Sequence, residues 1–304
     1  MTSNIINKRS FFGNTLTYLK SFLLLMKPRV MSLVIFTCAV GLLTSPVSVP
    51  YYNSIISIFF VAVGAGAAGA LNMWYEADLD KLMTRTCLRP IPTGKLNKNQ
   101  ALIFGIVLSL LSIVGLYYSS NLLSAVILFI TISFYVFIYT IWLKRKTPQN
   151  IVIGGASGAL PPVIGWTIAN NNLALEPITL FLIIFFWTPS HFWALSLYKS
   201  GDYKRAKIPM LPIISGVKTT KINILLYALI MSPAVVAPYL FNFASLFYLI
   251  VSSIMTVYYI YLCFKLYSSK IAKVSNKIAR KIFIYSIFYL FFIFLILLID
   301  NILK

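Results

Sequence analysis

Long apolar segments, separated by short polar connections, make up most of this chain. Nine of them are long enough to cross the hydrocarbon core of a bilayer as helices, which takes about 20 residues each. They lie approximately at residues 30–48, 54–73, 101–118, 122–143, 151–169, 178–197, 222–241, 243–264 and 282–300. The pattern predicts an all-α membrane protein, a bundle of nine transmembrane helices that forms one polytopic domain over residues 1–304.

The composition excludes a soluble globular protein, since 60% of the residues are hydrophobic, 11% are charged and the mean hydropathy is +0.87. A net charge of +20 could also indicate a nucleic-acid partner. The distribution of charge argues against that partner, because 25 of the 26 Lys and Arg residues precede the first apolar segment or fall in every second connection, and Lys304 alone falls on the other side. This asymmetry places the amino terminus in the cytosol and the carboxyl terminus outside.

Residues 1–29 are basic and free of acids, but they are short and lack a cleavable apolar core with a processing site. We expect a cytosolic leader rather than a transit peptide. This interpretation favours a bacterial plasma membrane over a mitochondrial inner membrane.

Two runs of small residues, 64–70 and 154–159, lie in the second and fifth apolar segments. Small residues let helix backbones approach closely within a membrane. We therefore expect tight helix packing at these two places.

Candidate chemistry concentrates at the end of the second apolar segment. Only six acids occur in the chain, and Glu76, Asp78 and Asp80 are three of them. Carboxylates at a bilayer boundary are costly unless a cation compensates them. On a helix, Asn72, Glu76 and Asp80 follow the spacing i, i+4, i+8 and share one face, and amide and carboxylate oxygens suit Mg²⁺. Asp78 points elsewhere on an ideal helix, and we expect it to join this metal site through water or loop geometry.

Arg85 and Arg89 follow, again four residues apart, and offer planar donors for phosphate. The alternative is a solvated loop whose acids pair with Lys81, Arg85 and Arg89. The concentration of half of all the acids in one patch argues against this alternative, because solvation alone would scatter them.

The segment from Asn72 to Asp80 resembles the first aspartate-rich motif of the UbiA superfamily of intramembrane prenyltransferases. A closer resemblance is to the protohaem IX farnesyltransferase family, and four further motifs carry it in the expected order. They are Arg85-Thr-x-x-Arg89-Pro90, Gly158-Ala-Leu-Pro-Pro-x-Ile-Gly-Trp166, His191-Phe-Trp-Ala-Leu195 and Asp202-Tyr-x-x-Ala-x-Ile-Pro-Met-Leu-Pro212.

The resemblance implies a UbiA-type bundle around an intramembrane cavity, with cytosolic cap loops at residues 74–100 and 198–221. Farnesyl diphosphate and haem b would be the substrates, haem O the product, and Mg²⁺ the cofactor that stabilises the leaving diphosphate. The residues expected to bind the diphosphate or the haem propionates are Arg85, Arg89, Lys199, Lys204 and Arg205. Contact with haem A synthase or with oxidase assembly proteins is a further expectation.

Two further positions carry open alternatives. Asp202 stands alone where the superfamily normally has a pair of acids, so it is expected either to bind a second Mg²⁺ through water or to pair with Lys199 or Lys204. His191 is the only histidine, and it could ligate haem iron, orient a carboxylate, move a proton or simply satisfy a buried hydrogen bond. We interpret both as catalytic candidates.

Three other functions fit parts of this pattern. A transporter would also have intramembrane polar groups and broken helices, but its polar residues should lie near the midplane rather than at one side. An assembly factor for a haem-containing oxidase would need no metal ligands. A prenyltransferase of quinone biosynthesis, acting on an aromatic acceptor, differs only in the haem-family motifs.

Overall fold

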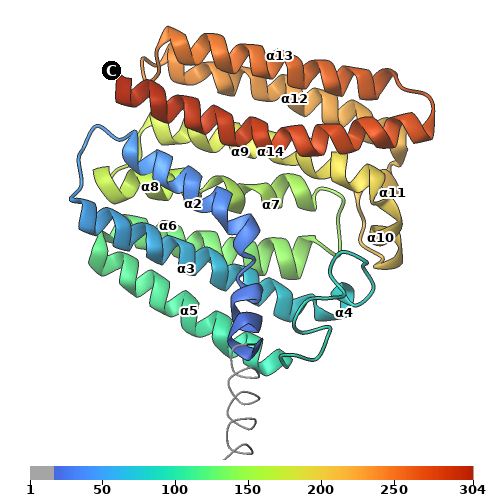
Figure 1. The fold of residues 1–304 in the computed structure, drawn as a ribbon, viewed down its shortest axis with the longest axis horizontal. Coiled ribbons are helices and arrows are strands. Elements are labelled where there is room, and N and C mark those ends of the chain that lie inside the picture. Colours follow the sequence, from blue (N-terminus) through green and yellow to red (C-terminus); the bar gives the residue numbers. More distant parts are fainter. Residues whose placement is uncertain (1–16, 304) are drawn as a thin grey trace, which may run out of the picture.

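The computed structural model describes residues 17–303, and over that range it is built of helices without a strand (Figure 1). After a short helix, Thr17–Leu25, the chain continues in the following order. The elements are α2 (Pro28–Leu43), α3 (Tyr51–Tyr75), α4 (Ala77–Asp80), α5 (Lys98–Ser119), α6 (Leu122–Ser133), the π-helix η1 (Phe134–Leu143), α7 (Asn150–Ala159), α8 (Pro161–Asn170), α9 (Leu175–Tyr198), α10 (Ser200–Arg205), α11 (Leu211–Ile214), α12 (Gly216–Leu240), α13 (Leu246–Ser268) and α14 (Ala272–Leu303).

The spans agree in number with the sequence pattern. Eight helices between residues 17 and 303 are long and apolar enough to cross a membrane, and the pair Thr17–Leu25 and α2, bent by 51°, makes up to nine. The helix α6 with η1 forms one span, and α7 with α8 forms another. The prediction of an all-α membrane protein is confirmed. The largest error in the boundaries is at α14, which begins at Ala272 rather than near residue 282, because its first turns are basic and continue the helix beyond the apolar segment.

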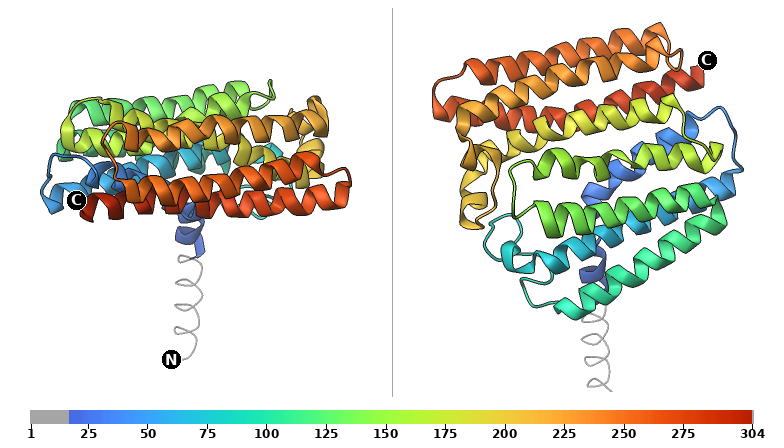
Figure 2. Two further views of the ribbon diagram at one scale, coloured as in Figure 1. Left: turned by 90° about the horizontal axis from the view of Figure 1, so that it is seen from above. Right: turned by 180° about the vertical axis from the view of Figure 1, so that it is seen from behind.

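The long helices lie in two layers, with α2 packed against α8 and α14 against α9, as the views in Figure 1 and Figure 2 show. Consecutive spans contact each other, and α14 returns to α2, so the chain order closes into a ring. The short helices α4, α10 and α11 gather at one end of the bundle, on the right in Figure 1. We call this end the cap end.

Proline positions set two of the breaks. Pro28 is the first residue of α2, and Lys27 before it has left-handed backbone (φ 53°), outside the right-handed helical region that a residue before proline avoids. Pro161 begins α8 and ends the ladder of α7 at Leu160, since proline has no N–H to donate.

The backbones of α2 and α8 approach each other closely at two glycines. A Cβ atom on Gly165 would lie 1.9 Å from the carbonyl oxygen of Cys38, and one on Gly41 would lie 2.1 Å from that of Pro162. The runs at residues 64–70 and 154–159 also pack tightly, but mainly against side chains such as those of Met26 and Tyr139. The expected close packing is present, and its tightest point lies outside both runs.

Candidate active site

The end of α3 buries three oxygen-bearing side chains together. Asn72, Glu76 and Asp80 are 2%, 4% and 3% exposed. The helix does not run straight through this segment, since α3 ends at Tyr75 and α4 restarts at Ala77. The backbone bonds from Glu76 N–H to Asn72 C=O and from Asp80 N–H to Glu76 C=O (3.0 and 2.9 Å) keep the helical register across the break. The three side chains therefore stay on one buried face.

Each of these side chains meets a cation from a different part of the chain. The Lys27 ammonium donates to Asn72 Oδ1 at 2.6 Å. Lys144 forms an ion pair with Glu76. Arg89 Nη1 donates to both carboxylate oxygens of Asp80 at 2.8 Å. The ion pair of Arg89 with Asp80 agrees with the alternative of a solvated loop. The burial of the cluster disagrees with it, because the ion pairs of a solvated loop would stay in water.

The π-helix η1 turns Thr140 toward the same cluster. Its hydroxyl accepts from Asn72 Nδ2 at 3.1 Å and donates to the carbonyl of Tyr135, five residues earlier, at 2.8 Å. This contact fixes the amide of Asn72 so that Oδ1 faces Lys27. Wide π-helical turns are rare and are frequently found at functional sites.

The donor set of this cluster fits Mg²⁺. An amide oxygen and two carboxylates are hard oxygen ligands, and Mg²⁺ is typically held by one or two carboxylates together with water and substrate phosphate. Within the described chain, Glu76 Oε1 is buried and forms an ion pair with the Lys144 ammonium, but it has no neutral hydrogen-bond donor. No group of three or more Asp, Glu, His or Cys side chains occurs among residues 17–303, so the amide of Asn72 would complete the set.

Asp78 does not lie with these three residues. Its side chain is 54% exposed and pairs with Arg145, whose guanidinium donates at 2.9 and 3.1 Å. Burial raises the pKa of the Asp78 carboxyl, but the hydrogen bonds and charge of Arg145 outweigh that effect, so its pKa lies below the ordinary value. The structure thus gives Asp78 a surface ion pair on the other side of α4.

The second cap segment is joined to the first through Asp202. This carboxylate is 5% exposed and accepts from the Thr84 hydroxyl at 2.9 and 2.8 Å. It also pairs with Arg205, one helical turn further on. The expectation that Lys199 or Lys204 pairs with Asp202 is wrong, because both lysines are exposed and Arg205 takes that place.

Loss of the Thr84 hydroxyl should loosen this connection. We expect Thr84→Val to lower the free energy of unfolding by about 1.5–3 kcal/mol, because a hydrogen bond to a buried charge is lost. Thr84→Ser keeps the hydroxyl and should retain most of the stability. Thermal unfolding of the purified protein in detergent measures both variants. Equal stability of Thr84→Val and the wild type would mean that the contact contributes little.

Arg85 and His191 also lie apart from the buried cluster. The Arg85 guanidinium donates to the Tyr203 hydroxyl at 3.3 Å and lies over the ring of that residue. His191 stacks between Trp187 and Phe283, with ring centroids 4.3 and 4.7 Å away, and its Nδ1 is 2.6 Å from Ser286 Oγ. The position of His191 in the structure therefore matches the alternative in which the side chain packs in the core and satisfies a buried hydrogen bond.

Sequence reasoning missed four residues of this region, namely Lys27, Thr140, Lys144 and Arg145. In the sequence pattern the three cations indicate only topology. A lysine directly before a proline at the start of a span was the one available signal, and it pointed to a helix break at Lys27. Thr140 had no signal, because the sequence does not mark a π-helix.

Comparisons with known proteins identify relatives of this chain by sequence. A sequence profile of the UbiA prenyltransferase family matches residues 33–299. A protoheme IX farnesyltransferase from Pelagibacter ubique is 68% identical over 279 residues, which cover 92% of this chain and 92% of the relative. Protoheme IX farnesyltransferase 2 from Mesorhizobium japonicum is 50% identical over 283 residues, or 93% of this chain and 90% of the relative.

Two solved structures share the fold at low sequence identity. A structure described for digeranylgeranylglyceryl phosphate synthase in membranes has a TM-score of 0.78 at 19% identity, covering 95% of this chain and all of that chain. A UbiA homolog from Archaeoglobus fulgidus, bound to DMAPP and Mg²⁺, has a TM-score of 0.65 at 16% identity, covering 89% and 99%. The helical bundle is thus the one found in these UbiA-type proteins.

Proposed function

The chain belongs to the UbiA prenyltransferase family, in the group of the protohaem IX farnesyltransferases, and we propose that it joins the farnesyl group of farnesyl diphosphate to a vinyl group of haem b with the aid of Mg²⁺. Prenyl transfer follows from the family. We propose farnesyl diphosphate as the donor and Mg²⁺ as the metal. The observation that carries them is the buried cluster of Asn72, Glu76 and Asp80 with its three cations.

The charges of this cluster suit a diphosphate. With the Lys27 amine protonated, Lys27, Lys144 and Arg89 bring three positive charges against the two negative charges of Glu76 and Asp80, which leaves an excess of one. A bound Mg²⁺ would raise the excess to three, the charge of a fully ionised prenyl diphosphate. Asn72, Glu76 and Asp80 would hold the metal, which neutralises a leaving diphosphate when bound.

The residues of the chain then have defined tasks. When the carboxylates and the amide turn to the metal, the three cations that now hold them become available to the diphosphate oxygens and favour its departure. The C–O bond of the donor breaks, and the allylic carbon bonds to the terminal carbon of the vinyl group. Water adds to the other vinyl carbon and loses a proton, which gives a hydroxyethylfarnesyl side chain. Buried surroundings protect the allylic cation from early capture by water.

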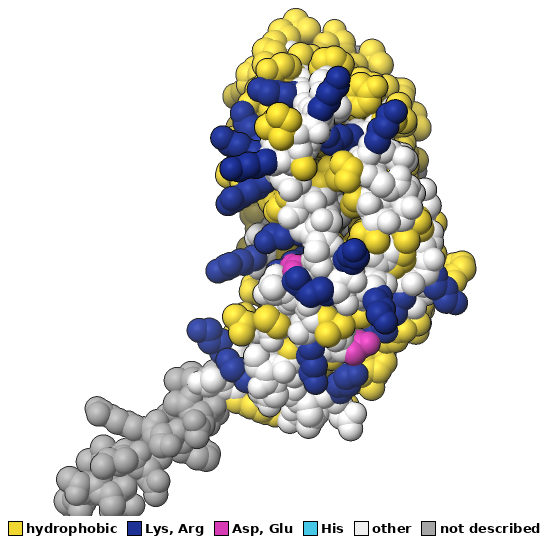
Figure 3. Space-filling view, turned by 90° about the vertical axis from the view of Figure 1, so that its right-hand side faces the viewer, with side chains coloured by type: hydrophobic (Ala, Val, Ile, Leu, Met, Phe, Trp, Pro, Cys, Tyr) yellow, Lys and Arg dark blue, Asp and Glu magenta, His cyan; other side chains and the backbone are white. Residues whose placement is uncertain are grey.

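The membrane orientation is part of the same proposal. The protein is a multi-pass membrane protein. Lys and Arg side chains crowd the cap end, which Figure 3 shows face on, with few acidic side chains between them. We infer that this end faces the cytosol of a bacterium, where diphosphate donors and Mg²⁺ are available. Contact with haem A synthase or oxidase assembly proteins stays a prediction.

Reconstitution of the purified protein in lipid nanodiscs tests the proposal. With haem b, farnesyl diphosphate and Mg²⁺, mass spectrometry should detect haem O. With excess EDTA the product should disappear, and added Mg²⁺ should restore it. Absence of haem O with the metal present would contradict the proposal, and so would equal yield in EDTA. A parallel reaction with a hydroxybenzoate in place of haem should give no prenylated product.

A further inference from the structure

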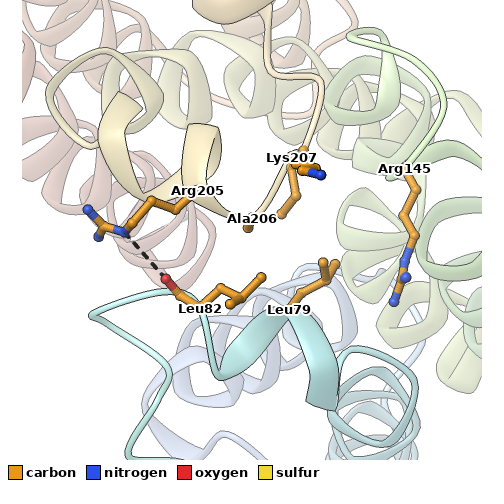
Figure 4. A pocket seen from close by; sticks show the side chains of 7 residues that line it. Leu79, Leu82, Arg145, Arg205, Ala206 and Lys207 are labelled. Carbon is orange, nitrogen blue, oxygen red and sulfur yellow. Dashed lines mark hydrogen bonds between the residues drawn. The ribbon is translucent and has the colours of Figure 1, made fainter.

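A pocket of about 380 Å³ lies at the cap end, between the first and the second cap segment (Figure 4). Leu79 and Leu82 line it from the first segment, and Ala206 and Ile208 line it from the second. These four side chains make its walls mainly apolar. The pocket is separate from the polar contacts of the Asn72, Glu76 and Asp80 cluster.

Three cations surround these apolar walls, namely Arg145, Arg205 and Lys207. Arg145 and Arg205 already meet Asp78 and Asp202. Lys207 forms no ion pair with any residue in the described part of the chain. An apolar pocket with cations at its edge, one of them without an ion pair, is complementary to an apolar molecule that carries carboxylates along one edge.

The end of α10 sets the position of Lys207. Its φ of 52° lies in the left-handed region, which a residue with a side chain rarely adopts. Ala206 and Ile208 on either side are buried, whereas Lys207 is exposed. The hydrogen bonds from Lys207 N–H to Lys204 C=O and from Ile208 N–H to Tyr203 C=O end α10 in a Schellman motif, which accounts for this conformation and leaves the Lys207 side chain at the edge of the pocket.

The pocket is also next to the reaction site. In the four-residue helix α4, Leu79 lines the pocket while the next residue, Asp80, lies in the buried cluster with Arg89. One turn of helix therefore separates the pocket from the carboxylates assigned to the metal and the diphosphate. A ligand that spans this thickness could have one edge among the cations and the other beside the prenyl donor.

We propose that this pocket binds the acceptor, with the propionate edge of haem b held by Lys207 and Arg145 and the macrocycle against the four apolar side chains. Haem b carries its two propionates on one side and its vinyl groups toward the other. Anchoring the propionates at the cap end directs a vinyl group toward the donor. This inference rests on the proposed function and adds the residues that select the acceptor.

A comparison of haem b with its dimethyl ester tests this assignment, because the ester lacks the negative charges and keeps the macrocycle. For the wild type in nanodiscs of neutral lipid, esterification should weaken binding by about 10-fold or more, as expected when charge-assisted hydrogen bonds are lost. In Lys207→Gln/Arg145→Gln, affinity for haem b should fall to that for the ester, and esterification should have little further effect. Farnesyl diphosphate binding should be unchanged.

Control variants separate recognition from folding. Lys218→Gln removes an exposed charge at the start of α12, outside the pocket, and should behave as the wild type. Lys207→Gly removes the amine and relieves the left-handed turn, so it should keep the thermal stability and still lose discrimination against the ester.

Two results would overturn the inference. One is an unchanged preference for haem b over the ester in the double variant. The other is a loss of farnesyl diphosphate binding with haem binding intact, which would assign these cations to the donor. A wild type that discriminates against the ester but makes no haem O would contradict the proposed function while leaving the pocket assignment standing.

Discussion

Asp80→Asn is expected to lower the rate of haem prenylation by about 10²–10³-fold, the loss typical of removing one group that stabilises developing charge. The amide has nearly the same shape but carries no charge for Mg²⁺. It also leaves Arg89 beside a neutral group. The initial rate of haem O formation in nanodiscs, measured by mass spectrometry at saturating Mg²⁺, gives the comparison.

Asp78→Asn provides the matched comparison two residues away. Because Asp78 is 54% exposed and paired with Arg145 at the surface, its charge is screened by water, and we expect the rate to fall by no more than about 3-fold. If both variants lose the same fraction of the prenylation rate, the burial of Asp80 and the exposure of Asp78 do not determine which acid acts in catalysis. Retention of wild-type elution and melting temperature by both variants excludes misfolding as the cause.

Gly165→Ala is expected to lower the free energy of unfolding by about 3 kcal/mol, at the upper end of typical overpacking. The added Cβ would lie 1.9 Å from the Cys38 carbonyl oxygen and 2.8 Å from the backbone nitrogen of Leu42. Backbone atoms cannot turn aside as a side chain can, so α2 and α8 would have to separate. Thermal unfolding in detergent, followed by tryptophan fluorescence, measures the loss.

Gly158→Ala is the control for this prediction. Gly158 lies in α7, in the other half of the same span, and a Cβ there would meet no heavy atom within 4 Å. Since alanine favours the helix by about 1 kcal/mol over glycine, this variant should be as stable as the wild type or more stable. Similar losses at both glycines would contradict the close contact of α2 and α8.

These glycines show what a run of small residues can and cannot predict about helix packing. The runs at residues 64–70 and 154–159 predicted tight packing, and their glycines do pack tightly except Gly158. Gly41 and Gly165 each face the backbone of the opposite helix, and both lie outside these runs. The reason is that the crossing point of two helices depends on their relative position in space. A run of small residues permits close approach without fixing where it occurs.

The buried cluster shows the same division. Its spacing could be predicted, because the positions of Asn72, Glu76 and Asp80 relative to one another follow from the helical repeat and survive the break at Glu76. Their partners could not be predicted, since Lys27 and Lys144 are 45 and 68 residues away from the groups they contact. Asp202 likewise accepts a hydrogen bond from Thr84, 118 residues earlier, and does not pair with its neighbouring lysines.

The sequence by itself thus determined the class of the protein, the number of its spans, the side on which its charges gather and the face that carries the acidic oxygens. These features depend on hydropathy and on the 3.6-residue period, which are properties of short segments. Only the tertiary structure decided which cation meets which oxygen, that the two cap segments join at Asp202, and that an apolar pocket edged by Arg145 and Lys207 lies between them. Such contacts bring together side chains from distant helices, and their partners are chosen by how the whole bundle packs.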